Sequence, residues 1–252
     1  MDSAFRVSLW GGALKVLALI PSLPKDLKQE TVDSVFNQKF DGEIELHVLT
    51  EVVKGGFLGE KVSYVLNRCI EKLDLTKYDW ILRLDGDTVL PSNFVKVSTS
   101  VPYDVGSVGK AGHCTIIRME AFLSCMPNQR FDKRVDDSTL YFNLMYHGWK
   151  CLDWQRDAWP LSFRPPGIVS SLRYFLYGGK IRYIEGYEPV HVLLTPFVQV
   201  KHGSLVNKNI FIWRNFLQFY AYLYYAFFDR RDRYPFFGYV RAWQVRRLIR
   251  WI

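Results

Sequence analysis

The sequence has few cysteines and no long hydrophobic run near its N-terminus. Its four cysteines occur singly, without a CxxC pair or other metal-ligand spacing, which excludes the usual zinc-site patterns and a dense disulfide framework. We therefore expect reduced thiols in a cytosolic protein. The early apolar stretch, residues 16–20, is short and soon meets Pro21 and Pro24, so we expect no signal peptide.

Acidic residues are scarce in the last fifth of the chain. Residues 201–252 contain ten Lys or Arg but only Asp229 and Asp232, so this segment carries the whole net charge of +8 and residues 1–200 balance to zero. Such an asymmetry indicates a domain boundary. The length of 252 residues suits one large α/β domain with an appendage. We expect the domains at residues 1–200 and 201–252.

Strand and helix patterns alternate in the first ninety or so residues. Short apolar or alternating runs predict strands, and apolar positions at helical spacing predict helices. The strand-like runs are residues 15–20, 43–50 and 80–84, and the helical runs are residues 24–38 and 59–73. This β-α-β-α-β order predicts a mostly parallel sheet wound by right-handed crossovers and flanked by helices.

Two carboxylates, Asp85 and Asp87, directly follow the third apolar run, with Gly86 between them. The end of a strand is where an open α/β sheet presents ligand-binding residues. We expect an extended chain that points both carboxylates the same way, and room at Gly86 for an anion to approach the backbone. Hard oxygen ligands suit Mg²⁺ or Mn²⁺. A plain Asp-Gly turn is the simpler alternative.

A second acidic pair, Asp136 and Asp137, precedes a run of apolar and aromatic residues that ends before Gly148. The pattern predicts a helix after the pair, with Gly148 in the position that commonly ends helices. Acids at a helix start are often simple caps that suit the helix dipole. Both a catalytic and a capping role therefore fit this pair.

Taken in order, these segments resemble the family-2 inverting glycosyltransferases of the GT-A fold. The resemblance runs from about residue 15 to about residue 152 and is carried by KVLALIPSLPKD, SVFNQKFDGEIELHVL, GEKVSYVLNRCI, LRLDGDTVLP and VDDSTLYFNLMYHGWK. It implies a GT-A domain that transfers a sugar from a nucleotide-sugar donor, such as a UDP- or GDP-sugar, with inversion at the anomeric carbon. The QRW motif of processive members is only half matched by QRDAW, which favours transfer of a single sugar.

The resemblance implies a donor-binding set. Pro21 would lie beside the nucleobase, and Asp85 near the ribose or the diphosphate. Family members usually carry an acidic motif after the second strand, where this chain has LTEVVKGG, so Glu51 is the candidate there. Asp136 stands where the family more often has glutamate.

The resemblance also implies the metal site and the catalytic base. Asp87, together with Asp85, would bind Mn²⁺ or Mg²⁺ bridging the diphosphate. Some GT-A enzymes add a downstream histidine, for which His191 and His202 are candidates, although a lone histidine is more often a packed or surface residue. Asp137 would be the base that deprotonates an acceptor hydroxyl.

The C-terminal segment has a different character. Residues 211–228 are as long as a spanning helix but are interrupted by Arg214, Asn215 and Gln218, and their aromatic composition suits the headgroup boundary of a bilayer. Residues 239–252 place apolar side chains on one helical face and arginines on another, as in helices that lie in a membrane interface. Packing on the catalytic domain or on another subunit is the alternative. No nucleic-acid-binding motif accompanies these basic residues, so we expect no nucleic-acid partner.

These observations predict a metal-dependent inverting glycosyltransferase that is peripheral, or monotopic, at the cytoplasmic face of a membrane. Anionic lipid would be its surface, and a lipid or lipid-linked molecule its acceptor. Two other classes fit parts of the sequence. A sugar nucleotidyltransferase would need a glycine-rich, basic phosphate loop near the first strand, which the sequence lacks. A catalytically inactive GT-A-like scaffold recruited to membranes would have no need of the three carboxylates Asp85, Asp87 and Asp137.

Overall fold

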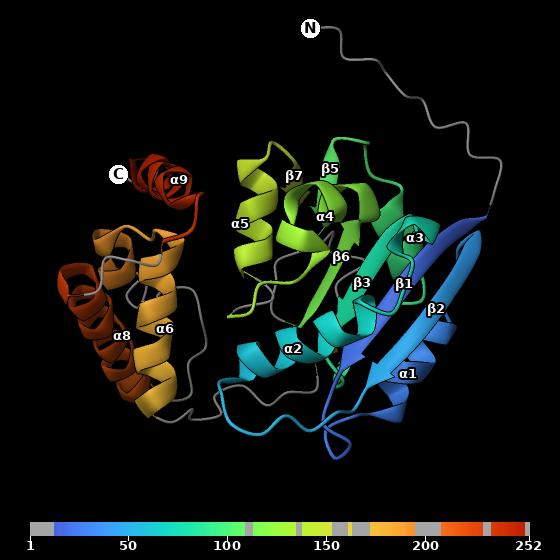
Figure 1. Ribbon diagram of the computed structural model, residues 1–252, viewed down its shortest axis with the longest axis horizontal. Coiled ribbons are helices and arrows are strands. Elements are labelled where there is room, and N and C mark those ends of the chain that lie inside the picture. The colour runs from blue at the N-terminus through green and yellow to red at the C-terminus, as the bar shows by residue number, and fades with distance from the viewer. Residues whose placement is uncertain are drawn as a thin grey trace, which may run out of the picture. The chain divides into compact units, whose positions relative to one another are not determined.

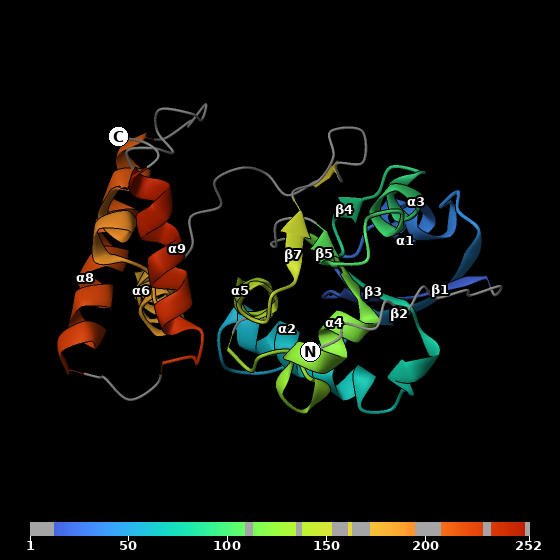
Figure 2. The same cartoon turned by 90° about the horizontal axis from the view of Figure 1, so that it is seen from above.

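The computed structural model describes residues 13–108, 113–134, 138–152, 161–162, 172–194, 208–228 and 233–249. The chain forms two compact units (Figures 1 and 2). Unit 1 comprises Met1–Val53, Val65–Arg130 and Trp149–Phe163, and unit 2 comprises Lys54–Tyr64, Phe131–Gly148 and Arg164–Ile252. The domain boundary expected near residue 201 lies outside the described residues.

Unit 1 is built on a six-stranded sheet with the order β2-β1-β3-β6-β5-β7. The strands are β1 (Leu14–Pro21), β2 (Gly42–Leu49), β3 (Trp80–Leu84), β5 (Val105–Val108), β6 (Cys114–Arg118) and β7 (Lys150–Leu152). Only β6 runs against the other strands of this sheet. A separate antiparallel pair joins β4 (Thr88–Val89) to β8 (Leu161–Ser162). The predicted mostly parallel sheet is therefore confirmed.

The central position of β1 explains its continuous apolar run. Residues 16–20 are completely buried, because β1 pairs with β2 on one side and β3 on the other and helices cover both faces of the sheet. Strands buried on both faces do not need polar alternation. The edge strand β2 does alternate, with Glu43 and Glu45 exposed beside half-buried Ile44 and Leu46.

Helices lie on both faces of the sheet, with α1 and α3 on one face and α4 and the end of α2 on the other (Figure 2). The helical segments of unit 1 are α1 (Gln29–Phe36), the end of α2 (Leu58–Ile70), η1 (Leu75–Lys77), α3 (Phe94–Thr99), α4 (Met119–Cys125) and η2 (Pro127–Gln129).

The first helix is shorter than the sequence pattern indicates. A helix was expected over residues 24–38, but α1 begins only at Gln29. The backbone N–H of Lys28 donates instead to the carbonyl oxygen of Gly86, at 2.8 Å. The Lys28 N–H is therefore used in a tertiary hydrogen bond and not in a helical one. The helix begins at the next residue, Gln29, five residues after the expected start.

Unit 2 contains mainly helices. They are α5 (Ser138–Tyr146), α6 (Leu172–Glu185), α8 (Lys208–Phe228) and α9 (Phe237–Ile249), together with helical residues 189–194 and the first turns of α2. The expected helix after the second acidic pair is confirmed as α5, and Gly148 beyond its end has a φ of +90°. In the part of the chain that the structure describes, no helix is long and apolar enough to cross a membrane.

Close contact between α6 and α8 depends on glycine. A β-carbon at Gly179 would lie 2.3 Å from the carbonyl oxygen of Gln218 and 2.6 Å from the Cβ of Ala221. Real β-carbons do not approach backbone so closely, because the repulsion is too strong. The two helix backbones can therefore meet only where this side chain is absent.

We expect Gly179→Ala to lower the free energy of unfolding by about 1–3 kcal/mol, because the added methyl overpacks a rigid contact. Gly238→Ala, in α9, is the matched control, since no atom lies within 4 Å of a β-carbon there. It should raise stability by about 0.5–1 kcal/mol through the higher helix propensity of alanine. Urea unfolding of both variants measures the difference, and equal stabilities would contradict the packing argument.

Candidate functional site

The Asp85-Gly86-Asp87 segment forms a turn between β3 and β4. The backbone N–H of Thr88 donates to the carbonyl oxygen of Asp85 at 3.1 Å. The backbone N–H of Asp85 donates to the carbonyl oxygen of His113 at 2.8 Å. The expected extended chain is therefore wrong here, because a turn closed by the Thr88-to-Asp85 hydrogen bond separates β3 from β4, which belongs to a second sheet with β8. Asp85 is buried and Asp87 is partly exposed.

The carbonyl oxygen of Gly86 is held by the connection between β1 and α1 and by the first turn of α1. It accepts the N–H of Lys28 at 2.8 Å and the hydroxyl of Thr31 at 3.1 Å. A β-carbon at residue 86 would lie 2.2 Å from Oγ of Ser22 and 2.5 Å from its Cβ. The room expected at Gly86 for an anion is thus filled by the side chain of Ser22, and glycine is required for a protein contact.

Asp85 forms a buried ion pair that no pattern in the sequence predicted. Its Oδ1 lies 2.7 Å from a terminal guanidinium nitrogen of Arg83, and the two residues are 7% and 6% exposed. A buried carboxylate is tolerated when a charged partner compensates it. The signal in the sequence was a lone arginine within the apolar strand WILRL.

Three predicted donor residues lie at or just after the ends of strands that finish at one edge of the sheet. Because β1, β2 and β3 are mutually parallel, their carboxyl ends meet there, where an open α/β sheet binds ligands. Pro21 is the last residue of β1 and pairs with Leu49 of β2, Glu51 comes two residues after β2, and Asp85 directly follows β3. Pro21 itself is buried.

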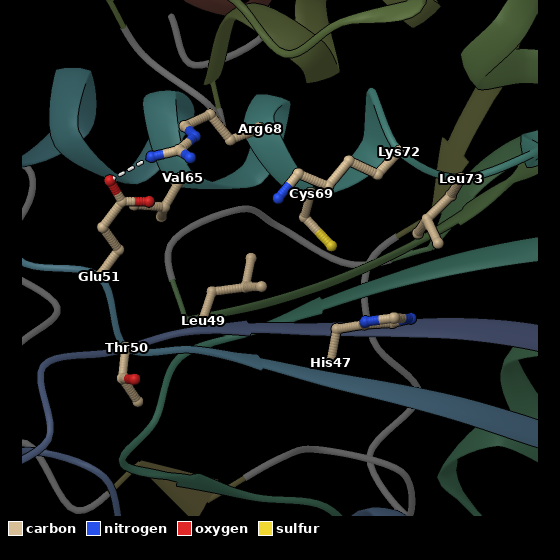
Figure 3. Close-up of a pocket in the computed structure, with 9 residues that line it drawn as sticks. All are labelled: His47, Leu49, Thr50, Glu51, Val65, Arg68, Cys69, Lys72 and Leu73. Carbon is tan, nitrogen blue, oxygen red and sulfur yellow. Dashed lines mark hydrogen bonds and ion pairs between the residues drawn. The ribbon is translucent and has the colours of Figure 1, made fainter.

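A cavity of about 270 Å³ lies between β2 and α2 in unit 1 (Figure 3). At one end Oε1 of Glu51 lies 2.5 Å from a guanidinium nitrogen of Arg68, and both side chains are nearly half exposed. The lining residues are His47, Leu49, Thr50, Glu51, Val65, Arg68, Cys69, Lys72 and Leu73. Burial raises the pKa of the Cys69 thiol, so this thiol stays protonated at neutral pH and is a weak nucleophile. The predicted residue Glu51 thus borders a cavity together with two basic side chains, Arg68 and Lys72.

The second acidic pair, Asp136 and Asp137, lies outside the described residues, as does His202. His191 belongs to unit 2, where its ring meets that of Tyr187 edge-on with 5.9 Å between centroids. Among the residues that the structure describes, no three His, Cys, Asp or Glu side chains gather in a group able to hold a metal ion.

Unit 2 holds the start of α5 through a buried glutamate. Glu185, at the end of α6, is 1% exposed. Its Oε1 accepts the hydroxyls of Ser138 at 2.5 Å and Thr139 at 3.2 Å. A carboxylate at the N-terminal turn of a helix also interacts favourably with the helix dipole. A side chain 46 residues distant along the chain therefore anchors the helix that follows the acidic pair.

The segment just before the acidic pair is also anchored within unit 2. Oδ1 of Asp132 accepts the Tyr234 hydroxyl at 2.6 Å and the backbone N–H of Arg134 at 2.8 Å. The Tyr177 hydroxyl donates to the carbonyl oxygen of Arg134 at 3.1 Å. Burial, with the nearby Asp132 carboxylate, raises the pKa of Tyr234, so its hydroxyl keeps the donated proton.

Unit 1 has a six-stranded, mostly parallel sheet with helices on both faces, and Pro21, Glu51 and Asp85 lie at its carboxyl edge. This arrangement is the GT-A fold. The structure is similar to that of the mannosyltransferase PcManGT from Pyrobaculum calidifontis, solved in complex with GDP-Man and Mn²⁺. The TM-score is 0.53 at 11% sequence identity, and the match covers 88% of this chain and 89% of that chain. At this identity the likeness shows the fold alone.

A second similar structure is residues 1–349 of TarS from S. aureus, solved in complex with UDP. Its TM-score is 0.44 at 11% identity, with 78% of this chain and 74% of that chain covered. No protein-family model matches the sequence, and a comparison with curated protein sequences gave no match.

We expect Gly86→Ala to destabilise unit 1 by about 1–3 kcal/mol, since its methyl group would overlap the Ser22 side chain. Ser22→Gly removes the overlapping atoms, so the double variant should recover most of the lost stability. Urea unfolding of the two single variants and the double variant measures this coupling. Additive effects would show that Gly86 is required for another reason.

We expect Glu185→Ala to lower the free energy of unfolding by about 2–3 kcal/mol, because two hydroxyls lose a charged acceptor. Glu71→Ala is the control, since Glu71 is likewise a paired glutamate, 3.2 Å from Arg130, but both of these side chains are nearly half exposed. Exposed pairs contribute at most about 1 kcal/mol. Chemical denaturation compares the two, and a larger loss in Glu71→Ala would contradict the assignment.

Proposed function

We propose that the chain is a metal-dependent inverting glycosyltransferase that moves a single sugar from a UDP- or GDP-sugar to a lipid or lipid-linked acceptor. The observation that carries the proposal is the placement of Pro21 at the carboxyl end of β1, and of Glu51, Asp85 and Asp87 after the carboxyl ends of β2 and β3, in a GT-A-fold sheet. The complex of PcManGT with GDP-Man and Mn²⁺ supports the choice of donor class.

The donor atoms at the turn fit a hard divalent cation. Asp87 is partly exposed at the sheet edge, and carboxylate oxygens suit Mn²⁺ or Mg²⁺. Asp85 already shares one oxygen with Arg83, so we assign the main metal contact to Asp87 and a supporting contact to Asp85. When bound, the cation would supply Lewis-acid stabilisation of the negative charge on the leaving diphosphate. Arg83 keeps the turn from carrying two uncompensated negative charges before the donor arrives.

The cavity beside β2 suits the nucleoside end of the donor. Glu51 can accept hydrogen bonds from ribose hydroxyls or from N–H groups of a base, and Arg68 and Lys72 offer positive charge beside it. The Glu51–Arg68 pair is nearly half exposed, so rearranging it on binding costs little. Pro21 would close the neighbouring edge, and Asp136 would complete the donor contacts.

The chemical step needs a base and a leaving group. Asp137 would accept the proton of an acceptor hydroxyl while that oxygen attacks the anomeric carbon. The bond from this carbon to the diphosphate oxygen breaks on the opposite face, so the configuration inverts and the nucleoside diphosphate leaves.

We also place the protein at the cytoplasmic face of a membrane. The basic, aromatic C-terminal segment supports a surface location, and a lipid-linked acceptor would be presented there. None of the four cysteines forms a disulfide, which is consistent with a reducing compartment.

We expect wild-type protein to release nucleoside diphosphate from a donor panel when Mn²⁺ or Mg²⁺ and a lipid extract are present. Asp87→Ala should lower the rate at least about 100-fold, because several kcal/mol of charge stabilisation are lost. Asp137→Asn should lower it by about 10²–10⁴, as expected for loss of a general base. Rates of diphosphate release measure both effects.

Glu43→Gln is the matched control, because Glu43 is an exposed acid at the start of β2, opposite the proposed site, and it should retain the wild-type rate. Full activity in Asp137→Asn alone would show that the acceptor is an already ionised phosphate. Pyrophosphate release would indicate the nucleotidyltransferase class. Absence of both turnover and metal-dependent nucleotide binding would refute the proposal and favour the scaffold.

A further inference from the structure

Helix α8 has two opposite faces in unit 2. One face packs on α6, where Gln218, Ala221 and Tyr222 are buried near Gly178 and Gly179. The other face exposes five aromatic side chains, which lie within an arc of about 120° at 100° per residue. We call them the α8 aromatic face: Phe216, Tyr220, Tyr224, Phe227 and Phe228, which are 43%, 65%, 50%, 67% and 76% exposed.

The composition of this face is unusual for a surface in contact with water. Residues 216–228 include no charged residue. The rings of Tyr224 and Phe228 lie 5.3 Å apart between centroids, so the aromatic surface is continuous from one turn to the next. Contiguous exposed apolar surface indicates an interaction site, and aromatic rings are especially enriched at membrane interfaces and in binding surfaces.

The charge of the sequence segment that contains this face favours an anionic partner. Residues 201–252 carry ten Lys or Arg and two Asp, a net +8. In α9, Val245 and Arg246 are exposed, while Arg241 is paired with Glu188 at 2.6 Å. A large aromatic surface within a basic segment matches a bilayer of anionic lipid, whose headgroups attract lysine and arginine and whose acyl boundary accepts the rings.

The same helix is not suited to crossing the bilayer. Within the described residues no helix meets the length and hydropathy that a span requires. Its opposite face also carries a buried glutamine, Gln218, against α6. One face bound to protein and one aromatic face are the arrangement of a helix that lies parallel to the membrane plane.

We propose that the α8 aromatic face inserts into the headgroup boundary of an anionic lipid bilayer, with α8 parallel to the surface. This assigns the membrane-binding role to particular side chains of unit 2. Membrane binding by this face does not involve the nucleotide-sugar donor, so it can be tested independently of glycosyl transfer. If the protein transfers a sugar to a lipid acceptor, that acceptor would reach the enzyme from the membrane bound by the α8 aromatic face.

The test is flotation of the full chain with phosphatidylcholine vesicles, with and without phosphatidylglycerol. Phe227→Ser is compared with Phe36→Ser, since Phe36 in α1 of unit 1 is 65% exposed and undergoes the same chemical change. Phe227→Ser should weaken binding to anionic vesicles about tenfold, because one ring no longer leaves water. Phe36→Ser should bind like wild type, and Phe227→Ser/Phe228→Ser should bind more weakly still.

Both side chains are exposed, so both single variants should unfold at the wild-type temperature, and thermal unfolding verifies this. Equal vesicle affinity of Phe227→Ser and wild type would overturn the proposal. Equal binding of wild type to both vesicle types would overturn its anionic part. If wild type ignores vesicles but forms a dimer that Phe227→Ser abolishes in sedimentation velocity, the face is an interface with a second copy and the proposal is wrong. Metal-dependent nucleotide binding, measured without lipid, reports separately on the proposed function.

Discussion

The carbonyl oxygen of Gly86 accepts one hydrogen bond from the connection between β1 and α1 and one from α1 itself, and the position of the acidic turn depends on them. Lys28 and Thr31 supply the donors, and Ser22 fills the space beside the glycine. Since β1 and β3 are parallel neighbours, these contacts tie together the loops that leave their two carboxyl ends. Asp85 and Asp87 are therefore placed by the backbone of another segment as well as by their own strand.

Each unit also buries a carboxylate that is held by polar partners. In unit 1 Asp85 is compensated by a full opposite charge from Arg83, which limits the negative charge at the turn. In unit 2 Glu185 accepts neutral hydroxyls at the start of a helix, where the dipole favours an anion. Loss of either partner would leave a charged or polar group unsatisfied in a low-dielectric environment.

The two faces of α8 reflect one constraint on packing. Gly178 and Gly179 let α6 approach the backbone of α8 closely, so the contacting face of α8 carries the small Ala221 beside Gln218 and Tyr222. Its most exposed aromatic rings are on the opposite face. Aromatic residues elsewhere in unit 2 form its core, as Phe142 does with Phe236. Exposure on α8 is therefore a property of one face, and composition alone did not identify that face.

Hydrophobic periodicity and strand order determined much of the parallel sheet from the sequence alone: the three parallel strands, the helix after the acidic pair and the edge at which Pro21 ends β1 while Glu51, Asp85 and Asp87 follow β2 and β3. These features depend on patterns within a few residues of one another. Only the tertiary structure decided the late start of α1, the turn at Gly86, the Arg83–Asp85 pair and the role of Glu185. The contact of Thr31 with Gly86 joins residues 55 apart, and that of Thr139 with Glu185 joins residues 46 apart. Such contacts form when packed elements bring distant polar groups together and burial makes every unpaired one costly, and no local pattern contains that information.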